Sequence, residues 1–172
     1  MSEYVSAETR RRAVVALGLG WFVALAALLT AATLEGCGAS ALEVHAGVAD
    51  VAGQVITASG EQLLEHRARD LRAAVDEAPA RDVAVAGVEA VQSRYEPAVA
   101  AYDALRLTHD AYVDTLVLAA AGDLDDVGRW VRLASRVVAS WAAWSAAGRA
   151  LGLDVVDPPA MLLALTSVGG AP

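Results

Sequence analysis

The chain has 172 residues, 56% of them hydrophobic, a mean hydropathy of +0.44 and a net charge of −8 at pH 7. This acidic balance excludes the basic face that nucleic acids require, and it argues against an electrostatic hold on anionic lipids. One cysteine and three scattered histidines exclude a disulfide framework and predict no structural metal, so we expect no cofactor.

The amino-terminal region begins with a basic cluster, Arg10, Arg11 and Arg12, followed by an uncharged run over residues 13–34. A helix of this length can cross a hydrocarbon core of about 30 Å. Arginines ahead of an apolar run are typical of a secretory signal. The sequence therefore predicts two segments: residues 1–36 as a signal leader or membrane span, and residues 37–172 as a helical body.

The residues Leu34, Glu35, Gly36 and Cys37 resemble a bacterial lipobox, in which a leucine, a small residue, and a glycine or alanine precede the cysteine. Glu35 departs from that pattern, because its position is normally small or uncharged. The resemblance implies that the arginines, Leu34 and Gly36 guide recognition and that the leader is removed before Cys37. Cys37 then carries a diacylglycerol and an acylated amino terminus (palmitate is one such chain). The residue after the cysteine is Gly38 and not aspartate. In lipoproteins of diderm bacteria this resembles the pattern of chains that are sorted to the outer membrane.

A second interpretation keeps residues 13–34 as an uncleaved span, which makes the chain a single-pass membrane protein. The arginines then stay inside by the positive-inside rule. Both interpretations place the body outside the cytosol, with the membrane as a partner through either a lipid or the amino-terminal helix.

The body shows apolar residues at steps of three and four, which predicts amphipathic helices. We expect an all-α fold: an elongated antiparallel bundle of three long helices plus a short carboxy-terminal helix. The expected long helices cover residues 40–78, 81–120 and 126–151. The third is expected to be capped by Asp123 or Asp125, and the short helix by Asp157.

Two features of the long helices carry further expectations. Pro97 removes a backbone donor inside the second helix, so we expect a kink or break near Tyr95. Three glycines of the first helix, Gly47, Gly53 and Gly60, weaken it and let a neighbouring helix approach closely.

No motif for catalysis, phosphate binding or metal binding is present, so we expect no catalytic residues and no enzyme. The best candidates for a partner or ligand face are aromatic and histidine side chains on the apolar stripes of the second and third helices. They are His109, Tyr112, Trp130, Trp141 and Trp144. The pattern nevertheless favours the interpretation that these side chains form the core, with His109 a hydrogen-bonded core residue.

The sequence thus favours a non-enzymatic envelope lipoprotein with a structural, adaptor or interaction role and a protein partner in the envelope. A small-ligand-binding lipoprotein, with a pocket between helices, is the first alternative. In outline only, a small anchored helical chain also resembles the outer lipoprotein of phage or prophage lysis machinery.

Overall fold

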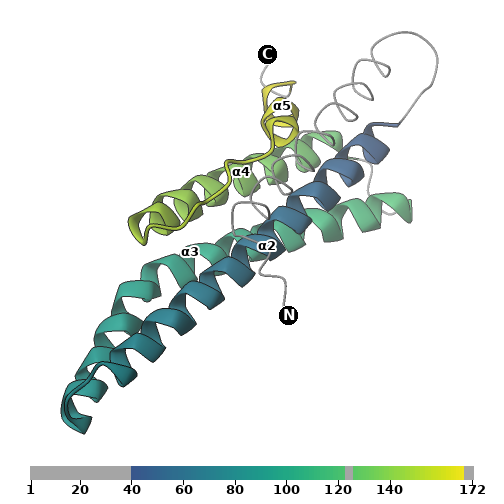
Figure 1. Ribbon diagram of the computed structural model, residues 1–172. Coiled ribbons are helices and arrows are strands. Elements are labelled where there is room, and N and C mark those ends of the chain that lie inside the picture. Colours follow the sequence, from purple (N-terminus) through teal and green to yellow (C-terminus); the bar gives the residue numbers. More distant parts are fainter. Residues whose placement is uncertain (1–39, 123–125, 169–172) are drawn as a thin grey trace, which may run out of the picture. The chain divides into compact units, whose positions relative to one another are not determined.

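The computed structural model describes residues 40–122 and 126–168, which form four helices and no strand (Figure 1). The helices are α2 (Ala41–Asp76), α3 (Arg81–Ala120), α4 (Val127–Ala150) and α5 (Ala160–Val168). The predicted all-α fold, with three long helices and one short carboxy-terminal helix, is confirmed. Within these residues no helix combines the length and the apolar character needed to cross a membrane.

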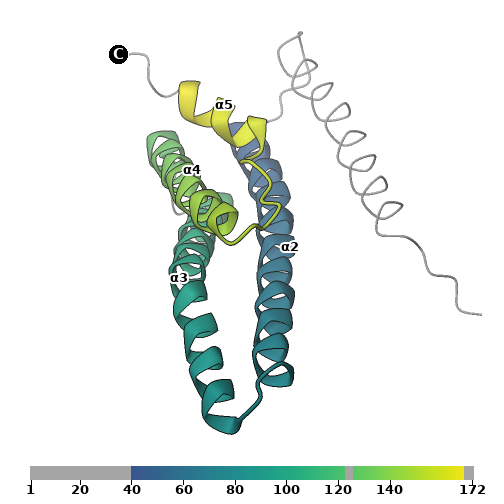
Figure 2. The same ribbon diagram turned by 60° about the vertical axis from the view of Figure 1, so that its left-hand side comes forward.

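Helices α2 and α3 form a long antiparallel hairpin closed by the short connection after Asp76 (Figure 2). Its register follows from contacts along the whole seam. Near the open end, His45 meets Tyr112, and near the connection a β-carbon on Gly87 would lie 3.4 Å from Ala74. At 1.5 Å per residue the 40 residues of α3 span about 60 Å.

Helix α4 covers the half of this hairpin that lies away from the connection, antiparallel to α3. Trp130 near its start contacts His45, and Trp144 near its end contacts Tyr102. Helix α5 packs against α4 and α2, and its Leu162 is fully buried. One core therefore joins the four helices, and its largest fully buried side chains are Trp141, Trp144, Tyr95, Tyr112 and Leu105.

The amino-terminal end of α4 corrects one detail of the sequence interpretation. Asp126 caps the helix, because its carboxylate accepts a 2.9 Å hydrogen bond from the backbone N–H of Arg129. The expected caps, Asp123 and Asp125, lie outside the described residues. At the other end Gly152 adopts a φ of 76°, a left-handed conformation that favours glycine, and ends the helix.

The segment after α4 turns back along it, and α5 begins at Ala160, later than expected. Asp157 does not cap α5, because its carboxylate pairs with Arg149. Instead, the Pro159 carbonyl accepts hydrogen bonds from the first turn of α5. The backbone N–H of Leu162 donates to it at 2.9 Å. The indole Nε1 of Trp141 donates a 2.9 Å hydrogen bond to the Val156 carbonyl and fixes this segment.

Of the kink or break expected near Tyr95, the break does not occur, because helix α3 continues through Pro97. Tyr95 is 1% exposed, and its packing holds this part of α3 in place. Tertiary burial therefore offsets the loss of one backbone hydrogen bond at the proline.

Gly60 supplies a close approach between α2 and α3. A β-carbon there would overlap the hydroxyl of Tyr102, whereas Gly47 on the same helix has open space around it.

We expect Gly60→Ala to lower the free energy of unfolding by about 1–3 kcal/mol, because Tyr102 must leave its place on Trp144. Gly47→Ala should raise it by about 0.5–1 kcal/mol. Thermal unfolding of the full chain in detergent measures both, and equal effects at the two positions would contradict the packing described.

Candidate functional site

The structure separates the predicted site residues. The predicted lipidation residue Cys37 and the predicted recognition residues lie outside the described residues; the latter are Arg10, Arg11, Arg12, Leu34 and Gly36. Of the predicted partner or ligand face, Tyr112, Trp130, Trp141 and Trp144 are buried in the core, with exposed fractions of 0 to 3%. His109 differs from them, because it also borders an open groove.

This groove runs between α2 and α3 and has a volume of about 870 Å³. Among the residues that the structure describes, its lining comes from α2 and α3, so α4 and α5 do not close it. The apolar part of the lining combines small and branched residues from α2 with mostly branched residues from α3. On α2 these are Leu42, Ala46, Ala49, Gly53, Ile56 and Ala58, and on α3 they are Val113, Leu116, Val117 and Ala120. Val117 is 61% exposed, so an apolar surface lies open to solvent along the groove.

His109 joins the two walls of the groove. Its Nε2 lies 2.8 Å from the carbonyl oxygen of Ala49, and a carbonyl only accepts, so Nε2 carries a proton and donates. A β-carbon at Gly53 would lie 3.0 Å from the imidazole Cε1, so the glycine provides the space for the ring. The other ring nitrogen, Nδ1, lies 3.8 Å from the carboxylate of Asp110, beyond hydrogen-bonding distance. His109 is therefore a cross-link of the hairpin that forms part of the groove wall.

A second histidine, His45, lies in the core on the α4 side of the hairpin. Its Nδ1 shares a 2.6 Å hydrogen bond with the hydroxyl of Tyr112, and its ring meets the Trp130 indole edge-on at 5.5 Å between centroids. Burial lowers the pKa of the His45 imidazole from its ordinary value and raises that of the Tyr112 phenol, because each charged form would lose its hydration. Both groups stay neutral near pH 7, and the pair ties together α2, α3 and α4.

A third polar cluster holds α2 and α3 together beyond the end of α4, and the sequence interpretation missed it. The Tyr95 hydroxyl donates a 2.8 Å hydrogen bond to Asp70 and also bonds Nδ1 of His66. Asp70 in turn pairs with Arg94. Burial, followed by the Asp70 carboxylate, raises the pKa of Tyr95, with Arg94 opposing. The sequence alone indicates a surface position for His66, because its neighbours Glu65 and Arg67 are both charged.

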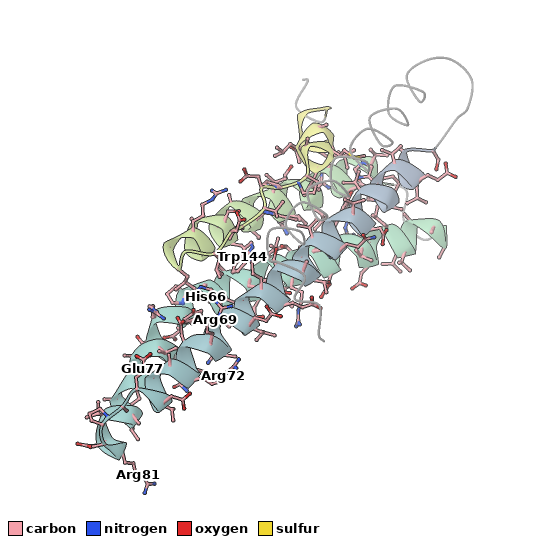
Figure 3. All side chains as sticks on the ribbon, in the orientation of Figure 1. His66, Arg69, Arg72, Glu77, Arg81 and Trp144 are labelled. Atoms are coloured by element: carbon pink, nitrogen blue, oxygen red, sulfur yellow. The ribbon has the colours of Figure 1, made fainter. Side chains whose placement is uncertain are left out.

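Figure 3 shows where this cluster lies relative to the aromatic core. His66 on α2 is placed beyond Trp144, toward the hairpin connection, and Arg69, Arg72 and Glu77 continue in the same direction. The position of His66 opposite the Tyr95 hydroxyl depends on the register of the hairpin. No spacing within either helix alone reveals it.

The described residues contain no group of three histidine, cysteine, aspartate or glutamate side chains placed to hold a metal ion. Comparison with protein families, characterised proteins and solved structures finds no match for this chain. The functional argument therefore rests on the sequence and on the geometry of the described residues. This geometry offers an open, partly apolar groove on one side of the hairpin and a buried aromatic core on the other.

The buried His45 predicts how stability depends on pH. Its pKa is lowered in the folded chain, so as pH falls below the ordinary value of 6.5 the unfolded chain takes up a proton that the folded chain refuses. Stability is therefore lost as pH falls below about 6.5, with a limiting slope of about 1.4 kcal/mol per pH unit.

We expect His45→Gln to flatten this part of the stability profile, measured by urea unfolding from pH 7.5 to pH 5. Gly47→Ala is the control, because it changes a position with open space on the same helix and alters no titratable group, and this variant should keep the slope. Equal slopes in the two variants would contradict the assignment to His45.

Proposed function

We propose that this protein is a bacterial envelope lipoprotein, anchored by acyl chains on Cys37, whose helical body has a structural or adaptor role. The observation that carries the proposal is the order of elements in the chain. An arginine cluster, an uncharged run over 13–34 and the motif from Leu34 to Cys37 follow one another, and α2 begins at Ala41.

The chemistry of such an anchor supports the proposal. Each methylene buried in a bilayer contributes about 0.8 kcal/mol, and stable attachment takes more than one chain. A cysteine carrying a diacylglycerol and an acylated amino terminus supplies several chains at one point. An adaptor role agrees with a rigid body whose buried polar side chains, such as His45 and Tyr112, bond to each other across helices.

The first test is the intact mass of the full-length gene product extracted from membranes. We expect the wild-type chain to lack residues 1–36 and to carry acyl chains on Cys37. Cys37→Ala should keep the leader and have the unmodified mass, because the acceptor sulfur is gone. If wild type and variant both have the unmodified mass of residues 1–172, the lipoprotein proposal fails and an uncleaved span replaces it.

Glu35 provides a second test of the same proposal. Its carboxylate stands two residues before Cys37, where the chain must enter an apolar site at the membrane, and an unpaired charge opposes that transfer. We expect Glu35→Ala to raise the ratio of mature to precursor chain several-fold in a pulse-chase experiment. Glu8→Ala, a carboxylate ahead of the arginines, is the control and should leave the ratio unchanged. A lower ratio for Glu35→Ala would contradict the proposal.

A further inference from the structure

The groove between α2 and α3 is an open surface of about 870 Å³ that α4 and α5 leave unfilled. α4 fills the opposite side of the same hairpin with Trp130 and Trp144. On the groove side, within residues 40–122 and 126–168, no helix lies over Ala46, Gly53 or Val113. Two adjacent helices with an apolar channel between them form the seat that a third helix fills by packing its side chains into theirs.

The charges around the groove indicate what kind of helix would fit. Its lining includes three carboxylates, those of Asp50, Glu61 and Asp110, and one guanidinium, that of Arg106. Asp50 follows Ala49 on α2 and Asp110 follows His109 on α3, and Ala49 and His109 are hydrogen-bonded across the seam. The two aspartates therefore stand on opposite sides of the groove at the same level, and a helix between them gains from basic side chains.

The chain itself carries a helix face with that character. α4 contains no acidic residue, and its charged side chains are all arginines. Arg129, Arg132 and Arg136 are spaced three and four apart, so they share one exposed face. With Asp126 and Leu133 they line a shallow depression of about 380 Å³. Among the described residues, Arg132 is the member of this trio that reaches a carboxylate, 3.4 Å from Asp126.

Between Arg136 and Arg149 the exposed residues of α4 are alanines. They are Ala139, Ala142, Ala143 and Ala146. Alanines allow a helix to sit deep between two others, while the arginines stand at one end of the face. The acidic groove and the basic face thus match in charge and in size.

We propose that the groove between α2 and α3 of one copy receives the arginine face of α4 from a second copy of this chain. The groove and the face lie on different helices, so the contact is head-to-tail and builds a ring or an open row of copies. This inference rests on the interaction role in the proposed function and names its partner. It does not depend on acylation of Cys37.

The absence of lysine from the chain makes a direct test available. Arg136→Lys keeps the charge and introduces a single side-chain amine, which a carbodiimide joins to a carboxylate in contact with it. The full chain is cross-linked in detergent as a mixture of ¹⁴N- and ¹⁵N-labelled copies, and the linked peptides are identified by mass. We expect mixed-isotope links from position 136 to Asp50, Glu61 or Asp110.

Arg149→Lys is the matched control on the same helix. Arg149 pairs with Asp157 of its own chain, so its links should carry one isotope. Links from position 136 that are confined to one chain would overturn the proposal. Links between copies at carboxylates outside the groove, or to residues 1–39, would overturn it as well.

Charge reversal tests the same contact in solution. The triple variant of Arg129, Arg132 and Arg136 to Glu, and the double variant of Asp50 and Asp110 to Arg, should each associate at least about tenfold more weakly than wild type. Mixing the two should restore association, because each then meets a complementary surface. Sedimentation of the full chain in density-matched detergent measures this, and added salt should weaken the wild-type assembly.

A variant that loses helical circular dichroism is replaced by the corresponding single substitution, Arg132→Glu or Asp110→Arg, at positions that are exposed. A wild-type chain that stays monomeric at every concentration overturns the proposal. So does a mixture of reversed variants that fails to associate. Because these readouts do not use Cys37, their failure is distinct from failure of the lipid anchor.

Discussion

The close approach of α2 and α3 is the constraint on which the rest of the described fold depends. At two points where α3 presents a ring, α2 presents a glycine: Gly53 faces His109 and Gly60 faces Tyr102. A larger side chain at either glycine would push the two helices apart and misalign the polar pairs along the seam. The hairpin therefore has one register, fixed by size at these two positions and by hydrogen bonds at His109 and Tyr95.

This register decides where α4 lies. Because Tyr102 and Tyr112 are held against α2, they meet α4 at two points ten residues apart along α3. Trp144 packs on the first at 5.5 Å between ring centroids, and Trp130 approaches the second through the ring of His45. Trp130 and Trp144 are buried in this packing, whereas Trp141 bonds the segment that follows α4. The same hairpin thus has one side covered by the aromatic residues of α4 and another side with an open, partly apolar groove that is bordered by charged residues.

Periodicity was sufficient to predict the all-α fold, because each helix buries a continuous stripe and its period is a local property of the sequence. Glycines in the first long helix also indicated close helix packing, and Gly53 and Gly60 do lie against rings of α3. What local pattern could not supply was the pairing between helices: His66 with Tyr95, or His45 with Tyr112. The groove was unpredictable for the same reason, since it depends on which side of the hairpin α4 occupies. The interpretation that the tryptophans form the core, rather than a partner or ligand face, matches their burial.

The proposed anchor and the proposed contact between copies restrict each other. Cys37 stands five residues before Leu42, which lines the groove, and five extended residues reach at most about 18 Å. An acylated Cys37 would therefore hold that end of every groove close to the membrane surface. Copies confined to one surface meet at a raised effective concentration, so a head-to-tail contact too weak to persist in solution can still order them there. Rows of copies parallel to the membrane would satisfy both the anchor at Cys37 and the head-to-tail contact. Rows growing away from the membrane would satisfy the contact but not the anchor.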